Sequence, residues 1–311
     1  MLLNGAMKID QRNAGASQTF TAAAALAYSV DRWYGYCTGA NVTGARIATA
    51  AALNRYRFTG LAANSGVGLA QRMEASGTMH LAGANATLQV KAASSSLTSL
   101  NWALFYANSA DAFGTLASPT RTSIASGSFT INATEATYLA TIAIPAAAST
   151  GLELVLSGGA LLGTQTLTLG DVALEPGTFT AVPPFAIRPL PLELLMCQRY
   201  FEKSFPMAVA PAQNTGSFVD GAYAVQTVGA SQSSGFGDVT FKVTKRAVPG
   251  IVFFNPSAAD AQARNRSVAA STSSLAISEV GERSFSASYT SGAGTAATSA
   301  NVFHWTASAE L

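Results

Sequence analysis

The chain has 311 residues, of which 49% are hydrophobic and only 11% are charged, against about 25% charged in an average globular domain. Eighteen Lys and Arg residues face sixteen Asp and Glu residues, and no basic run is longer than Lys245-Arg246. This balance argues against a nucleic-acid-binding surface. No stretch reaches the roughly 18 uncharged apolar residues of a membrane span, and the first residues lack a basic leader. We therefore expect no membrane insertion and no export signal.

The length favours two domains, because a single core seldom grows this large. Residues 1 to about 176 form short alternating segments divided by Gly, Ser, Asn and Ala turns, a pattern typical of a sandwich or jelly roll. The strand-like segments are 28–33, 55–58, 87–91, 102–106, 138–142 and 152–156. Several alternate with period two, which places one face on a core and the other outward. We assign residues 1–180 to a first, jelly-roll domain.

Residues 181–204 contain the densest proline cluster in the chain and then the one convincing helical pattern. We interpret this segment as a Pro-rich linker followed by a short helix. The helix is apolar on more than one side, so we expect it to be buried, either between the two domains or against copies of itself. The residues assigned to this interdomain or oligomer contact are Leu192, Leu195, Met196, Arg199 and Tyr200.

Alternation returns after residue 204, which predicts a second β-sandwich over residues 205–311. Its strand-like segments are 223–228, 239–243, 251–254, 284–289 and 302–305. The predicted fold class is therefore all-β, with two jelly-roll-like β-sandwich domains joined by one short α-helix.

Residues that commonly carry chemistry are sparse. His80 and His304 have no ligand partner at metal-binding spacing, so neither a metal site nor a cofactor is expected. Cys37 and Cys197 are predicted to be reduced, buried thiols. Nucleophile elbows and phosphate-binding loops are missing from the sequence.

Close carboxylate pairs could in principle serve glycoside hydrolysis. The close pairs are Asp171 with Glu175 and Glu279 with Glu282. They fit solvated turn or strand-edge charges better, so no catalytic residue is assigned and no enzyme activity is expected.

Aromatic side chains are the remaining candidates, because rings stack on the apolar faces of sugars. The candidates for glycan binding are Trp33, Tyr34, Tyr36, Tyr56, Trp102 and Tyr106. Core packing is the competing interpretation for each of them.

Two stretches carry a resemblance to a known family. NGAMKIDQRNAGAS (4–17), YSVDRW (28–33), QRME (71–74) and LQVK (88–91) resemble a family of phage and prophage virion proteins. These carry a jelly-roll module similar to carbohydrate-binding modules. PFAIRP (184–189), Glu193 and CQRYFEKS (197–204) resemble the linker helix that follows such modules in tail-fibre and head-fibre proteins, and FKVTKR (241–246) with Pro249 is loosely similar to the distal domain. The resemblance brings no catalytic residues.

The resemblance implies a structural component of a phage virion surface, such as a short fibre, spike or decoration protein, made in the bacterial host cytoplasm. We expect a homotrimer that docks on capsid, portal or tail components, because low charge leaves apolar surface that neighbouring copies would cover. An alternative is a receptor-recognition protein that binds a host surface glycan, and a third is a glycan depolymerase. An exposed aromatic cluster on one sandwich face would favour the glycan-binding alternative.

Overall fold

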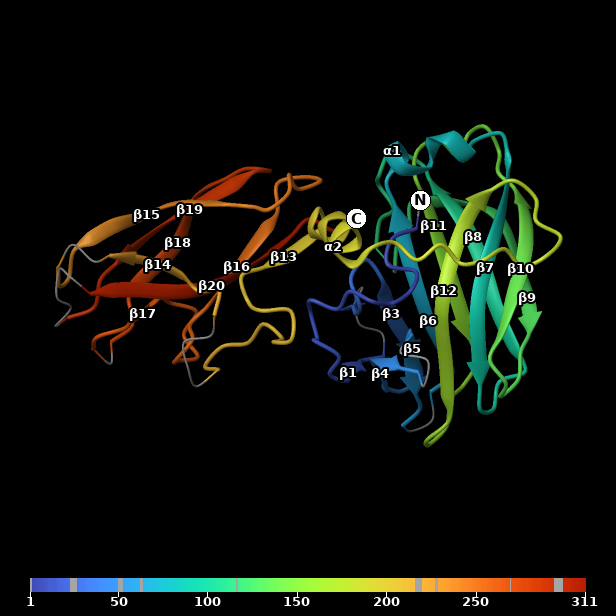
Figure 1. Ribbon diagram of the computed structural model, residues 1–311, viewed down its shortest axis with the longest axis horizontal. Coiled ribbons are helices and arrows are strands. Elements are labelled where there is room, and N and C mark those ends of the chain that lie inside the picture. The colour runs from blue at the N-terminus through green and yellow to red at the C-terminus, as the bar shows by residue number, and fades with distance from the viewer. Residues whose placement is uncertain are drawn as a thin grey trace. The chain divides into compact units, whose positions relative to one another are not determined.

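The computed structural model describes residues 2–22, 27–49, 53–61, 64–115, 117–215, 220–226, 229–268, 270–293 and 299–311. The chain is nearly all β and forms two compact units, residues 1–193 together with Leu311, and residues 194–310 (Figure 1). The units divide after Glu193, within the predicted linker 181–204 and inside helix α2 (Leu190–Gln198). The predicted fold class, two β-sandwiches joined by a short helix, is confirmed.

The N-terminal unit, residues 1–193 with Leu311, consists of two six-stranded antiparallel sheets. The first sheet has the order β1 (Gln18–Phe20), β4 (Val42–Ala48), β5 (Asn54–Thr59), β12 (Thr166–Pro176), β7 (Asn85–Ser94) and β10 (Ala136–Ala143). The second sheet has the order β2 (Ala27–Tyr28), β3 (Tyr34–Thr38), β6 (Gly66–Met73), β11 (Leu152–Gly158), β8 (Ser99–Ala107) and β9 (Arg121–Thr130). Several neighbouring strands, such as β12 and β7 or β6 and β11, are far apart in sequence, as in a jelly roll.

The core of this unit lies between the two sheets and follows the period-two pattern of the strands. In β7, Leu88, Val90 and Ala92 are fully buried, and in β11 so are Leu154 and Leu156. Burying each Leu or Val side chain contributes about 1.5–3 kcal/mol. The alternate residues of the same strands form the two outer faces of the sandwich.

The segment 28–33, predicted as one strand, is instead a short strand followed by a turn. Strand β2 ends at Tyr28, β3 begins at Tyr34, and Arg32 has a positive φ of 73°. Asp31 accepts the Gln11 amide at 2.9 Å, and the Asn4 side chain donates to the Asp31 carbonyl at 3.0 Å. These contacts with the N-terminal segment outweigh the strand propensity of the residues in the turn.

A second helical segment was not predicted. Helix α1 (Ala75–Thr78) continues into a 3-10 turn, η1 (Met79–Leu81), between β6 and β7. The segment is too short to show helical periodicity in sequence. None of the helices within the described ranges is long and apolar enough to cross a membrane.

The C-terminal unit, residues 194–310, is a smaller sandwich. Its central strand β20 (Ala300–Ser308) pairs with β13 (Phe201–Lys203), β14 (Tyr223–Gln226), β16 (Gly250–Phe254) and β17 (Arg264–Asn265). A three-stranded sheet has the order β15 (Ser233–Thr240), β19 (Ser284–Thr290) and β18 (Ser273–Val280). An aromatic core fills this unit, with Phe285 and Trp305 in edge contact at 5.4 Å between ring centroids.

Helix α2 is less buried than its apolar sequence predicted. Leu192 and Leu195 are 49% and 43% exposed, Met196 and Arg199 are half-buried, and Tyr200 is buried but follows the end of the helix. The polar residue Glu193 faces inward instead, because it forms an ion pair with Arg188 at 2.9 Å and accepts the Asn4 amide. This orientation leaves Leu192 and Leu195 on the outer side.

Candidate functional site

Three of the aromatic residues predicted to bind glycans belong to the core between the two sheets. Trp33 is fully buried, and its indole N–H donates to the Asn4 carbonyl at 3.1 Å. Tyr56 is 1% exposed, and Trp102 is 9% exposed beneath the edge strand. These side chains cannot offer a ring face to a sugar, so their assignment to a glycan site is wrong.

Two further predicted residues lie in different places. Tyr106 is half-buried and packs against the same core as Trp102. Tyr34 points to the opposite side of the second sheet, where it forms a separate apolar cluster with Ala70 and Val155. Tyr36 packs against this cluster, so two of the predicted residues, Tyr34 and Tyr36, lie on the face that marks the candidate site.

The candidate site is the outer face of the second sheet, meaning the side that points away from the core. Strand register brings residues from distant parts of the chain into rows across this face. The rows are Tyr34, Ala70, Val155 and Ala103; Tyr36, Gly68, Ser157 and Asn101; and Arg72, Glu153 and Phe105. In the first two rows, small side chains therefore follow the tyrosines of β3, and the third row carries two charged residues and Phe105.

Tyr36 lies flat across a glycine on the neighbouring strand. A Cβ atom added at Gly68 would come within 2.2 Å of Tyr36 Cζ and 2.3 Å of Cε1. Only glycine lets the ring settle on the sheet in this way. The ring is half-buried, so part of it remains open to solvent.

Tyr28 and Tyr34 extend the aromatic side of the face. Their ring centroids are 6.0 Å apart in an edge arrangement. The Tyr34 hydroxyl donates to Glu153 Oε1 at 2.5 Å, and the Tyr28 hydroxyl donates to the Leu311 carbonyl at 3.0 Å. Leu311 belongs to the N-terminal unit.

The buried carboxylate of Glu153 accepts hydrogen bonds from residues on both sides of this face. Glu153 is fully buried, and its Oε1 accepts from Arg72 Nε at 2.7 Å while its Oε2 accepts from Arg121. The Arg121 guanidinium lies 4.0 Å from the centroid of the Phe105 ring. Arg72 lies 5.6 Å from the Tyr34 centroid. Because two arginines and a phenol share one carboxylate, these side chains hold fixed positions.

Burial also controls the ionisation of the tyrosines on this face. Desolvation raises the pKa of Tyr28 and of Tyr36 above the usual value of 10. The pKa of Tyr34 is raised further, first by desolvation and then by the charge of Glu153. All three hydroxyls are therefore neutral hydrogen-bond donors at physiological pH.

The outer face of the first sheet has a different chemistry. Arg55, which is 1% exposed, binds Glu135 at 2.8 Å and Asp171 at 3.0 Å, and Lys91 lies 3.7 Å from Asp171. The Arg55 hydrogen bond lowers the pKa of Glu135. Asp171 has a positive φ of 44° at a bulge in β12, which turns its carboxylate toward this network.

Asp171 is not the solvated turn charge that the sequence predicts, because it is buried and forms ion pairs with Arg55 and Lys91. Two cations and two carboxylates neutralise each other on this face, and the network contains no aromatic ring. The carboxylates of Asp171 and Glu153 are thus bound to arginines, not free for general acid or base work.

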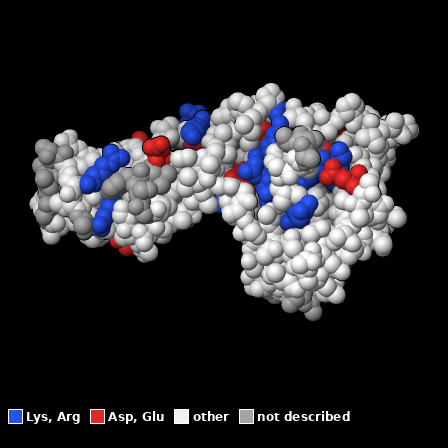
Figure 2. All heavy atoms as spheres, turned by 60° about the horizontal axis from the view of Figure 1, so that its bottom comes forward, with Lys and Arg blue, Asp and Glu red and all other residues white. Residues whose placement is uncertain are grey.

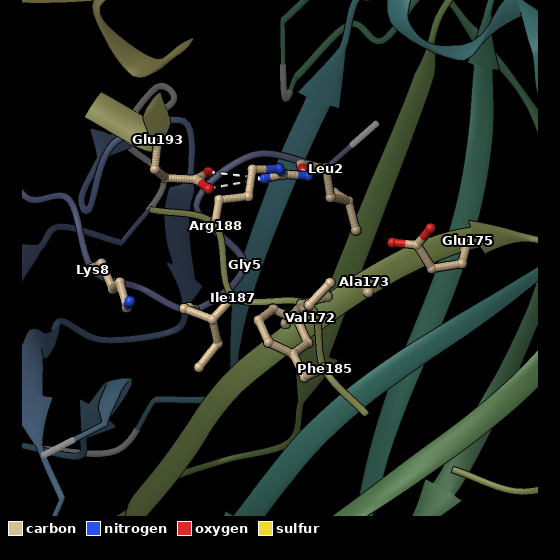
Figure 3. A pocket seen from close by; sticks show the side chains of 12 residues that line it. Leu2, Gly5, Lys8, Val172, Ala173, Glu175, Phe185, Ile187, Arg188 and Glu193 are labelled. Carbon is tan, nitrogen blue, oxygen red and sulfur yellow. Dashed lines mark hydrogen bonds and ion pairs between the residues drawn. The ribbon is translucent and has the colours of Figure 1, made fainter. Parts of the chain in front are cut away.

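A small cavity of about 40 Å³ lies where the proline-rich segment meets the N-terminal residues. Figure 3 shows Arg188 and Glu193 joined above it, near Leu2, with Phe185 and Ile187 along its side. The volume suits a few water molecules and no saccharide. The cavity reflects how residues 185–188 are anchored to the N-terminal unit.

Other residues singled out in the sequence have structural surroundings. Cys37 and Cys197 are buried and unbonded to each other. His304 is buried and stacks on Phe205 at 4.0 Å, and His80 is exposed. In the part of the chain that the structure describes, no group of three or more His, Cys, Asp or Glu residues could hold a metal ion.

The residues that sequence reasoning missed are Tyr28, Gly68, Arg72, Phe105, Arg121, Glu153 and Val155. Their only sequence signal is the alternation within each strand. In β8, the core positions Leu100, Trp102 and Leu104 alternate with Asn101, Ala103 and Phe105. Because both sets contain apolar and aromatic residues, alternation alone does not say which set faces outward.

Comparisons with known proteins give weak structural similarities. No family model and no curated protein matches the chain. A carbohydrate-binding module of family 4 aligns with 57% of this chain and all of its own length, at 14% identity and a TM-score of 0.36.

A carbohydrate-binding module of family 61, solved with β-1,4-galactotriose, aligns with 47% of this chain and 88% of its own at 8% identity and a TM-score of 0.32. Tailspike protein 4 of bacteriophage CBA120 aligns with 47% of this chain but only 19% of its own, at 14% identity and a TM-score of 0.33. These values are too low to assign a ligand or an activity.

Proposed function

We propose that the N-terminal unit binds carbohydrate on the outer face of its second sheet. The observation that carries this proposal is the Tyr36 ring lying flat on Gly68, beside a centre made of small side chains. A flat, partly open ring stacks on the apolar face of a sugar. Small neighbours leave room for the sugar to approach the sheet.

Polar groups around this ring support the same role. The side chains of Asn101 and Ser157 lie in the same register row as Tyr36. Phe105 lies further along β8, the strand of Asn101, and Arg121 lies on the neighbouring strand β9. Sugar recognition needs an apolar platform and a few oriented donors and acceptors at its edge. On the outer face of the first sheet, by contrast, Arg55, Lys91, Glu135 and Asp171 neutralise one another in ion pairs.

The test is binding of the full chain to a panel of immobilised polysaccharides, followed by calorimetry with oligosaccharides from any that bind. Tyr36→Ala and Phe105→Ala should each weaken binding about tenfold, which corresponds to about 1.4 kcal/mol. Leu139→Ala is the matched control, because Leu139 is half-buried on the outer face of the first sheet. Equal loss in all three variants, or no loss in the first two, would contradict the proposal.

We also propose that the chain acts as a component of a phage particle, as a binding protein and not as an enzyme. The support is the sequence resemblance and the uncharged surface. Figure 2 shows charged side chains gathered in a few clusters, with wide uncharged areas between them. The side chains of Leu190, Leu192 and Leu195 are 55%, 49% and 43% exposed. Other copies of the chain would cover this apolar surface in an oligomer.

Light scattering of the full chain tests this assembly. A trimer that a Leu192→Ser/Leu195→Ser double variant converts to monomer would support the homotrimer and its helix contact. A wild-type monomer would contradict an intrinsic trimer, and docking would then depend on capsid, portal or tail partners.

A further inference from the structure

We infer that the outer face of the second sheet selects acidic saccharides, with Arg121 binding a sugar carboxylate. This inference rests on the proposed carbohydrate-binding function and names its ligand class. This selectivity depends on which charged groups of this face have hydrogen-bond donors that no other described residue accepts.

The negative charge of the face is enclosed. Along the described strands β3, β6, β11, β8 and β9, Glu153 is the one carboxylate directed to this side. It is fully buried; its Oε1 accepts from Tyr34 and Arg72, and its Oε2 accepts from Arg121. An approaching anion therefore meets no exposed carboxylate oxygen of Glu153.

The positive charge reaches solvent at Arg121. Its side chain is 17% exposed, against 3% for Arg72. Nη1 of Arg121 donates to Glu153, while Nε and Nη2 have no hydrogen-bond partner among the described residues. Arginine carries five N–H donors in a fork that matches a carboxylate.

The orientation of Arg121 is fixed in advance. The guanidinium lies over Phe105 at 4.0 Å and is anchored at one nitrogen by Glu153. A planar cation stacked on a ring loses little further freedom when it binds. The remaining donors thus form a prepared carboxylate-binding edge at the row of Glu153 and Phe105, which the row of Tyr34 and Val155 separates from the Tyr36 row.

The experiment compares two hexasaccharides with one backbone: hexagalacturonate, and the same oligomer with its carboxylates methyl-esterified. Calorimetry with the full chain should give at least tenfold tighter binding of the acidic form, with an affinity that falls as salt rises. Arg121→Gln should remove this preference without abolishing binding of the ester. Arg57→Gln, an exposed arginine of the first sheet, is the control and should leave it intact.

The variant Arg121→Lys guards against misfolding, because it retains a cation beside Glu153. It should fold like the wild type and keep only part of the preference, since lysine lacks the fork. Equal binding of the acid and the ester would overturn the acidic selectivity and leave the proposed function standing. Binding of neither oligomer, while a neutral polysaccharide of the panel binds, would also overturn it. If no saccharide binds at all, the proposed function itself fails.

Discussion

Replacing Glu153 by Gln would test the network that organises the proposed binding face. The carboxylate is fully buried and accepts from Tyr34 at 2.5 Å, from Arg72 at 2.7 Å and from Arg121. Its loss leaves Arg72, only 3% exposed, without its buried counter-charge. Breaking a buried pair in this way costs about 3–5 kcal/mol. A unit of this size loses about 2–4 °C of Tm per kcal/mol, so a decrease of about 10 °C is expected.

Scanning calorimetry and tryptophan fluorescence during unfolding would measure this change. Trp33 and Trp102 report on the N-terminal unit and Trp305 on the C-terminal unit, so the affected transition can be assigned. Glu135→Gln is the control, because Glu135 is 31% exposed and its partner Arg55 keeps Asp171. A Glu153→Gln effect below about 1 kcal/mol, or one equal to the control, would refute the role given to this buried charge.

Three further outcomes are expected. Gly68→Val should displace the Tyr36 ring, because a Cβ atom at this position would lie 2.2 Å from Tyr36 Cζ. We expect the folded state to lose about 1–3 kcal/mol of stability and saccharide binding to weaken in calorimetry. Unchanged binding would contradict the role of the Tyr36 ring in holding the sugar. The hydrogen bond from Arg55 lowers the pKa of Glu135. The ionised Glu135 therefore adds its full contribution to folding stability above the usual pKa of 4.5, and this stability is lost as the pH falls through the lowered pKa. The Tm should therefore fall on acidification less in Glu135→Gln than in the wild type, and parallel curves would argue against the ion pair. Trp33→Ala should cost about 3–5 kcal/mol in denaturant unfolding; lost sugar binding at unchanged stability would instead return Trp33 to the binding site.

The positions of most strands can be predicted because apolar and polar residues alternate along them in the sequence. Segments 55–58, 87–91 and 152–156 lie within β5, β7 and β11. The turn between β2 and β3 was not predictable, since Asp31 and Arg32 are held by contacts with residues near position 10 and position 72. Such tertiary hydrogen bonds leave no periodic signal.

The binding face was harder to predict than the strands. The sequence marks Tyr36 as a candidate, yet the position of its ring depends on Gly68, which the register of β3 and β6 places beneath it. Trp102 and Phe105 lie three residues apart on β8 and face opposite ways, so the larger ring was the wrong choice. Only strand pairing decides which face is buried.

Hydrogen exchange of the full chain, with and without the tightest-binding oligosaccharide of the panel, tests the location of the binding face most directly. We expect protection in β3, β6, β11 and β8, and no change in the strands of the first sheet. Protection confined to the first sheet or to the C-terminal unit would contradict a binding face built on Tyr36 and Gly68.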